Sequence, residues 1–230
     1  MKTKVFNLII LDESGSMSCI ERQALNGLNE TLQTIRKAQE KYPEQEQFVS
    51  IVPFESGNIR LLRDKVSIKE VNDLRPEEYN PGGGTPLFDA IGFGINSIRK
   101  QVSEDDSVLV TIITDGEENC SREFSGKAIA TIIDELKQKG WMFTYIGANQ
   151  DAIRVAMTIN ISNALNFVQD DKGTSEMFEK ERRSRERYLE ENAICYLKFS
   201  PMMAREVRRK KACASDYFED KPKKKTNNTK

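Results

Sequence analysis

Three side chains with oxygen donors stand at alternate positions directly after the first apolar run of the chain. Asp12, Ser14 and Ser16 follow residues 5–11, a short apolar run typical of a buried strand in a parallel sheet. Open α/β sheets bind ligands at the carboxyl ends of such strands, and hard cations such as Mg²⁺ take oxygen ligands. The three residues are therefore half of a candidate metal site. They would equally suit the N-cap of a following helix, where Asp and Ser are favoured.

Two further oxygen donors follow other predicted elements. Asp115 comes directly after residues 107–114, a run rich in β-branched residues that predicts a second buried strand. Thr85 follows three consecutive glycines and precedes an apolar stripe that predicts a helix over residues 87–102. The glycines also suggest a phosphate-binding loop, but the spacing and the Lys-Ser/Thr ending of a P-loop are missing. Because the carboxyl ends of parallel strands meet at one sheet edge, we expect Thr85 and Asp115 to lie near Asp12.

The elements that must position these groups alternate between strands and helices. This alternation predicts an α/β fold with a doubly wound, mostly parallel sheet and helices on both faces. The short link at residues 55–58 predicts one antiparallel strand at the sheet edge. We expect strands at residues 5–11, 48–54, 59–66, 107–114, 142–146 and 164–168, and helices at residues 20–41, 87–102, 125–139 and 151–157.

The motifs described above occur together in one known family. Asp-x-Ser-x-Ser, Gly-Gly-Thr-Pro-Leu-x-Asp and Thr-Asp-Gly, in this order within residues 4–168, resemble the von Willebrand factor type A domain. The chain looks most like the small stand-alone bacterial members. The resemblance implies a Rossmann-like fold and a metal-ion-dependent adhesion site (MIDAS) that holds Mg²⁺ or Mn²⁺. The metal ligands that it implies are Asp12, Ser14, Ser16, Thr85 and Asp115.

The resemblance also implies what the metal does. In the family the two aspartates hold the ion mostly through water, and the other ligands are neutral hydroxyls, so the ion keeps most of its charge. A partner protein that presents Asp or Glu would complete the coordination. We therefore expect a metal-dependent protein-binding module in an adaptor or complex-assembly role. Asp89, four residues after Thr85, would either orient the Thr85 loop without touching the metal or have a purely structural role, which we favour.

The main catalytic alternative is a Mg²⁺-dependent phosphohydrolase with Asp12 as the nucleophile. That chemistry usually needs a second aspartate two residues later and a phosphate-binding lysine. Residue 14 is serine, and no lysine stands in a matching loop. The chain also has no histidine, which removes the base of a serine hydrolase. We therefore expect no enzymatic activity.

The end of the chain differs in charge from the rest. Residues 172–230 contain 17 basic and 10 acidic residues, whereas the remainder contains 18 basic and 26 acidic residues. We expect a domain at 1–170, a charged helical extension at 171–200 that lies across the domain or projects from it, and a basic, disordered tail at 201–230. A nucleic-acid-associated role is a further alternative, although the acidic body disfavours it. Its candidate phosphate contacts are Arg208, Arg209, Lys210 and Lys211.

The expected location is the cytoplasm. No apolar run approaches the ~20 residues that cross a bilayer, and the N-terminal apolar run meets Asp12 without a signal-peptide cleavage site. Widely separated cysteines indicate free thiols in a reducing compartment. These are Cys19, Cys120, Cys195 and Cys213.

Overall fold

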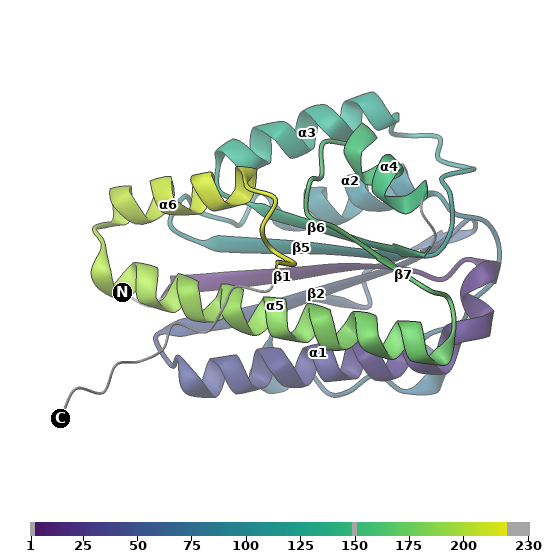
Figure 1. The fold of residues 1–230 in the computed structure, drawn as a ribbon, viewed down its shortest axis with the longest axis horizontal. Coiled ribbons are helices and arrows are strands. Elements are labelled where there is room, and N and C mark those ends of the chain that lie inside the picture. The colour runs from purple at the N-terminus through teal and green to yellow at the C-terminus, as the bar shows by residue number, and fades with distance from the viewer. Residues whose placement is uncertain (1–2, 149–150, 220–230) are drawn as a thin grey trace.

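A seven-stranded sheet with helices on both faces forms the centre of the molecule (Figure 1). The computed structural model describes residues 3–148 and 151–219. The strand order is β3-β2-β1-β5-β6-β7, and β4 also pairs with β2. The strands are β1 (Thr3–Asp12), β2 (Gln45–Glu55), β3 (Asn58–Ile59), β4 (Arg63–Ser67), β5 (Ser107–Thr114), β6 (Met142–Ala148) and β7 (Ala164–Phe167). The predicted doubly wound α/β fold is confirmed.

Parallel pairing joins the central strands. β1 lies between β2 and β5 and is parallel to both, and the pairs β5–β6 and β6–β7 are also parallel. Every residue of β5 is buried, as are the last eight residues of β1. Helices on both faces explain why these strands are mostly apolar along their buried length. The arrangement places the carboxyl ends of β1 and β5 side by side.

The antiparallel edge contains two short strands where the sequence predicts one. The region expected as a strand at 59–66 is divided between β3 and β4, which pair with different parts of β2. The register between β2 and β4 shifts between Val49 and Ile51, and Lys65 has a positive φ of 52°. A short, irregular edge strand is a poor template for pairing with another chain.

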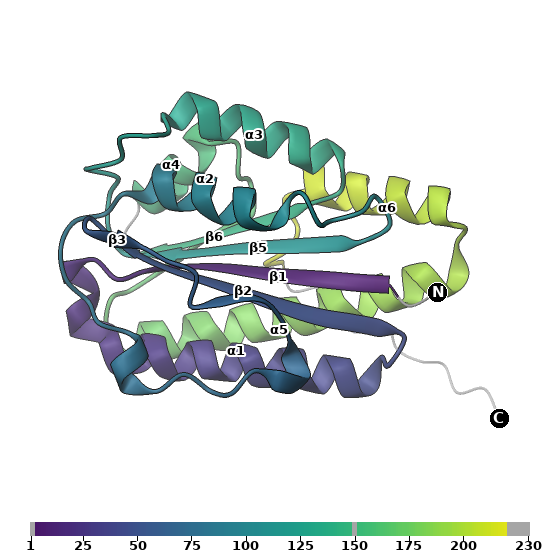
Figure 2. The same cartoon turned by 180° about the vertical axis from the view of Figure 1, so that it is seen from behind.

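Helices α1 and α5 cover one face of the sheet, and α2, α3 and α4 cover the other (Figures 1 and 2). Ile9 of β1 packs under the first pair and Ile10 under the second group, because successive strand residues face opposite ways. The helices are α1 (Glu21–Lys41), α2 (Leu87–Ile98), α3 (Gly126–Gln138), α4 (Asp151–Thr158), α5 (Asp171–Lys198) and α6 (Pro201–Cys213), with 3₁₀ turns η1 (Gly15–Ile20), η2 (Ile68–Glu70) and η3 (Pro76–Glu78). In the described part of the chain, no helix combines the length and apolar composition needed to cross a membrane.

The charged helix α5 lies across the sheet rather than projecting from it. Its Arg185 is completely buried and donates a hydrogen bond from Nε to Glu181 Oε1 at 2.9 Å. The same guanidinium reaches β1 through Asn7 Oδ1 at 2.9 Å and β5 through Thr111 Oγ1 at 2.8 Å. A buried ion pair with further hydrogen bonds thus anchors the extension to the centre of the sheet.

Part of the segment expected to be a disordered tail is folded. Residues 201–213 form α6, which buries three side chains at four-residue spacing. After α6, Tyr217 and Phe218 are buried in the core between α1, α5 and the sheet. The remaining residues of that prediction, 220–230, lie outside the described residues. The buried residues of α6 are Ala204, Arg208 and Ala212.

Candidate metal site

Asp12 is the last residue of β1, and its side chain is fully buried. Its Oδ1 accepts a hydrogen bond from the backbone N–H of Ser14 at 2.6 Å. Its Oδ2 accepts one from the hydroxyl of Thr114, the last residue of β5. These bonds hold the carboxylate at the carboxyl ends of the strands. We call this region the metal edge, defined by the predicted ligands Asp12, Ser14, Ser16, Thr85 and Asp115.

The two serines connect Asp12 to Asp115. The hydroxyl oxygens of Ser14 and Ser16 lie 3.1 Å apart, within hydrogen-bond distance. Ser16 donates in turn to Asp115 Oδ1 at 2.8 Å. The loops after β1 and β5 therefore meet through side-chain oxygens, as the strand order requires.

Thr85 reaches the same place from the loop before α2. A Cβ atom added to Gly116 would lie 2.7 Å from Thr85 Oγ1 and 3.5 Å from Asp12 Oδ2. Both oxygens therefore border the space next to the Gly116 backbone. The structure thus brings together all five residues that the sequence predicts as ligands.

Hydrogen bonds join the three loops of the metal edge. Gly15 donates its N–H to the carbonyl of Gly83 at 3.1 Å. Asn119 Oδ1 accepts from the N–H of Thr85 at 2.9 Å, and the N–H of Asn119 donates to the Thr85 carbonyl at 3.2 Å. Gly83 has a φ of +68°, a conformation that favours glycine. The glycine-rich loop is therefore held against both neighbouring loops.

Two carboxylates beside the metal edge hold backbone segments. Asp89 accepts the backbone N–H groups of residues 122–124 at 2.7 to 2.9 Å. Glu118 accepts the N–H of Phe88 at 3.0 Å and the hydroxyl of Ser121 at 2.6 Å. Asp89 thus anchors the loop that follows β5 to α2, which is a structural role.

Burial disfavours negative charge at both aspartates. It raises the pKa of Asp12 to about 6, even though hydrogen bonds from Thr114 and Ser14 lower it, and the nearby charge of Asp115 raises it further. Burial also raises the pKa of Asp115, against hydrogen bonds from Ser16 and Gln169. A cation at the metal edge would reverse both shifts by favouring the ionised forms.

The donor set fits a hard divalent cation. All five side chains offer oxygen, which suits Mg²⁺ or Mn²⁺ rather than a softer metal. Only two of them are carboxylates, and the chain has no histidine. Within residues 3–148 and 151–219, no group of three or more His, Cys, Asp or Glu side chains is placed to hold a metal. A metal at this edge would therefore depend on the hydroxyls as much as on the aspartates.

Sequence reasoning missed Gln169 at the metal edge. Its Nε2 donates to the Asp115 carboxylate and, at 3.0 Å, to the carbonyl of Ser16. Gln169 follows β7 by two residues, and β7 is parallel to β6. Its position after a parallel strand was the available signal, because such strand ends share one edge.

The four residues considered for nucleic-acid binding do not form one free basic surface. Arg208 is only 3% exposed, and it donates to the backbone carbonyls of residues 104, 105 and 106 in the turn before β5. Lys210 and Lys211 form ion pairs with glutamates at 2.9 and 2.6 Å. Arg209 is exposed. Arg208 therefore has a structural role, and its burial makes it unsuitable as a phosphate contact.

Comparison of the sequence with family models gives a match to the von Willebrand factor type A domain over residues 8–181. The match covers more than half of the chain and extends into α5. No curated protein matches the sequence.

Solved structures share the fold at low sequence identity. PilB minor pilin from Streptococcus sanguinis matches with a TM-score of 0.55 and 11% identity, over 82% of this chain and 63% of that one. The pilus adhesin SpaC from Lactobacillus rhamnosus GG has a TM-score of 0.62 and 11% identity, over 81% and 30%. The vWF domain of the pili tip protein Mfa5 from Porphyromonas gingivalis has a TM-score of 0.55 and 10% identity, over 82% and 97%. This chain thus spans less than two thirds of PilB and SpaC but nearly all of the Mfa5 domain.

Proposed function

This chain belongs to the von Willebrand factor type A family, and we propose that it is a metal-dependent protein-binding module. In this proposal an Asp or Glu of a partner protein completes the coordination of Mg²⁺ or Mn²⁺ at the metal edge. The supporting observation is the convergence of oxygen donors from three loops, of which only Asp12 and Asp115 carry charge. Such a module would serve as an adaptor or in complex assembly.

The residues of the metal edge have distinct parts in this proposal. Asp12 and Asp115 would supply negative charge to the ion, and Thr85 and the two serines would supply neutral hydroxyls. When bound, the ion provides a positively charged position that attracts a carboxylate. Thr114 orients Asp12, and Gln169 together with Ser16 orients Asp115. These contacts would keep the donors in place before the partner arrives.

We propose binding rather than catalysis at this edge. A phosphohydrolase would need an acid two residues after Asp12, and Ser14 there is engaged with Ser16 instead. The chain offers no histidine as a general base. We also propose a cytoplasmic location, which is supported by the absence of a disulfide among the four cysteines.

The test is capture of a partner in the presence and absence of the metal. The immobilised chain is incubated with lysate in Mg²⁺, washed, and eluted with EDTA, and the eluted proteins are identified by mass spectrometry. Parallel baits carry Thr85→Ala, which removes one ligand, and Lys37→Glu, which changes an exposed residue of α1. A genuine partner is retained by the wild type and by the Lys37 variant only.

A second step tests the coordination itself. The acidic contact residue of the purified partner is changed to its amide, and affinity is measured by calorimetry. Loss of Mg²⁺-dependent affinity supports the proposal. Equal affinity with the amide, or in EDTA, would show that the partner does not reach a bound metal.

A further inference from the structure

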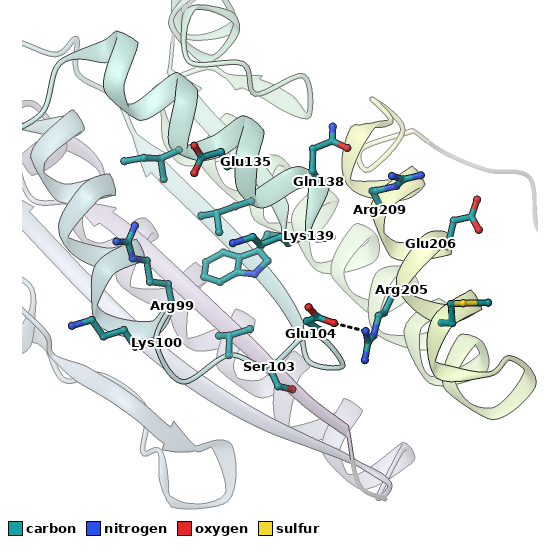
Figure 3. A pocket seen from close by; sticks show the side chains of 15 residues that line it. Arg99, Lys100, Ser103, Glu104, Glu135, Gln138, Lys139, Arg205, Glu206 and Arg209 are labelled. Carbon is teal, nitrogen blue, oxygen red and sulfur yellow. Dashed lines mark hydrogen bonds and ion pairs between the residues drawn. The ribbon is translucent and has the colours of Figure 1, made fainter.

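A groove lies at the end of the sheet opposite the metal edge. It has a volume of about 860 Å³, which is within the usual range for ligand sites. The C-terminal ends of α2 and α3 and one side of α6 border it (Figure 3). Trp141, which precedes β6, lines it together with Ile132, Leu136 and Val102. We call this feature the distal groove.

The rim of the distal groove has more positive charge than its own acidic residues neutralise. Glu104 is paired with Arg205, and Glu206 is paired with Lys210 at 2.9 Å, which leaves Glu135 as the acidic rim residue outside these pairs. Four exposed cations, three of them just after the ends of α2 and α3 and one on α6, surround the groove, and none of them forms an ion pair with a described residue (Figure 3). They are Arg99, Lys100, Lys139 and Arg209.

Apolar side chains are exposed around the bend between α5 and α6, and one of them belongs to the distal groove. Met202 lines the groove and is 77% exposed. Leu197, Phe199 and Met203, close to it in the chain, are 72%, 40% and 50% exposed. Neighbouring exposed apolar side chains of this size mark interaction surfaces, and methionine adapts its shape to different partners. The groove therefore combines apolar lining residues, among them the exposed Met202, with a rim that carries more basic than acidic residues.

We propose that the distal groove binds an acidic segment of a second protein, which inserts an apolar side chain into the groove beside Met202. The carboxylates of the segment would pair with the four rim cations, and its Leu or Phe would fill the apolar interior. This combination follows the usual division of an interface into an apolar centre and a polar rim. The site is separate from the metal edge, so the chain would connect two acidic partners.

The shape and charge of the groove favour a protein over other anionic partners. A flat lipid surface cannot fill a concave space whose wall is formed by Trp141. Stacking of a nucleic-acid base would need an exposed aromatic face, and Trp141 is only 4% exposed.

The only tryptophan of the chain is Trp141, so its fluorescence reports binding at the distal groove directly. The probe is a short synthetic peptide with one Leu flanked by several Glu residues, titrated into the full chain in EDTA. We expect a saturable change in Trp141 emission. Two control peptides replace the Glu residues by Gln or the Leu by Ser, and both should bind at least ~10-fold more weakly.

Variants of the chain locate the interaction. Lys139→Glu combined with Arg209→Glu should weaken the peptide ~10-fold or more, and Met202→Gln should weaken it less. Arg22→Glu combined with Lys37→Glu separates total charge from position, because both residues are exposed on α1, away from the groove, and the change in charge is the same. Asp12→Ala should leave the response unchanged, so that failure of the proposed metal function and failure of this site are distinguishable. Circular dichroism checks that each variant is folded.

The results of these titrations distinguish an acidic peptide from a lipid surface and from a second copy of the chain as the ligand of the distal groove. A response to the peptide that the Lys139 and Arg209 substitutions remove supports the proposal. Three results would overturn it: no response, an equal response in these variants, or a response to phosphatidylserine vesicles with none to the peptide. An emission that changes with protein concentration alone would instead assign the groove to a second copy of this chain.

Discussion

The hydroxyl of Ser16 donates a 2.8 Å hydrogen bond to Asp115, a residue 99 positions later in the chain. The bond connects the loops that follow β1 and β5, and it uses two groups that are both predicted metal ligands. Without a cation, these ligands satisfy one another. Metal binding at this edge would therefore replace hydrogen bonds among the predicted ligands by coordination to the ion. The metal affinity can be measured directly.

Mg²⁺ should raise the melting temperature of the wild type but not that of Asp12→Asn. A ligand that binds only the folded state stabilises it by roughly 2.7 kcal/mol at 100 times its Kd. The amide preserves the shape of Asp12 but removes the charge that attracts the ion. Differential scanning calorimetry in Mg²⁺ and in EDTA measures the effect. Glu30→Gln, an exposed change on α1, should respond like the wild type, and an unchanged melting temperature in the wild type would contradict the metal site.

Without metal, Asp12 should make stability fall as pH rises. Its pKa is about 6 in the folded chain against an ordinary 3.8, so the folded state holds its proton more tightly than the unfolded state does. The free energy of unfolding should therefore decrease between about pH 4 and pH 6, by roughly 3 kcal/mol from this group. Urea titrations in EDTA test this as the difference between wild type and Asp12→Asn. The variant should be the more stable of the two at pH 7, and the less stable one in Mg²⁺.

Gly116→Ala should weaken metal binding while the fold is retained. The added Cβ would lie 2.7 Å from Thr85 Oγ1, which is too close, so the threonine hydroxyl must move. A displaced ligand loses coordination geometry, and we expect a ~10-fold or larger loss of Mg²⁺ affinity in calorimetry. Gly82→Ala is the matched control, because a Cβ there would meet nothing within 4 Å. Equal Mg²⁺ affinity in the two variants would show that Thr85 is not a metal ligand.

Arg185→Met should destabilise the chain strongly. It leaves Glu181, which is 1% exposed, as a buried charge without its partner, and such losses cost about 3–5 kcal/mol. Adding Glu181→Leu should restore much of the stability, since an apolar pair can replace a buried ion pair. Urea unfolding of the single and double variants gives both values. A double variant no more stable than the single would show that the pair does not act as a unit.

A short and a longer C-terminal deletion within the expected basic tail should have different effects on stability. Removal of residues 221–230 leaves every described contact in place, so stability and Mg²⁺ affinity should not change. Removal of residues 214–230 also deletes the buried Tyr217 and Phe218, and it should lower the melting temperature by several degrees. Thermal unfolding of both truncated chains is the measurement. Equal loss in both would place an important contact beyond residue 220.

Hydropathy patterns predicted the sheet and the position of Asp12 and Asp115 at one sheet edge, for a physical reason. The buried strand β5 is mostly apolar and has no charged residue, so the first charged residue after it, Asp115, marks the end of the strand. The carboxyl ends of parallel strands share one sheet edge, so the sequence predicts Asp12 near Asp115. Thr114 and Asn119 could not be foreseen, because a hydrogen bond between loops leaves no periodic pattern in the sequence.

The C-terminal elements were harder to predict because their buried residues are not apolar. α5 buries Arg185 and Glu181 together, and a hydropathy scale counts both as surface residues. α6 buries Arg208 between Ala204 and Ala212, and alanines at four-residue spacing give little signal within a basic segment. A buried charge of this kind needs hydrogen-bond partners from strands that are distant in the sequence, and these partners come close only in the folded chain.

The anchoring of Arg185 also limits how the molecule can deform. Sliding α5 along the sheet by one helical turn, about 5.4 Å, would separate Arg185 from Asn7 and Thr111 and leave a charge among apolar side chains. Axial displacement of this helix is therefore strongly opposed. The two ends of β5, which lead to the metal edge and to the distal groove, stay roughly 23 Å apart. The protein would then act as a rigid spacer that sets the distance between whatever occupies its two ends.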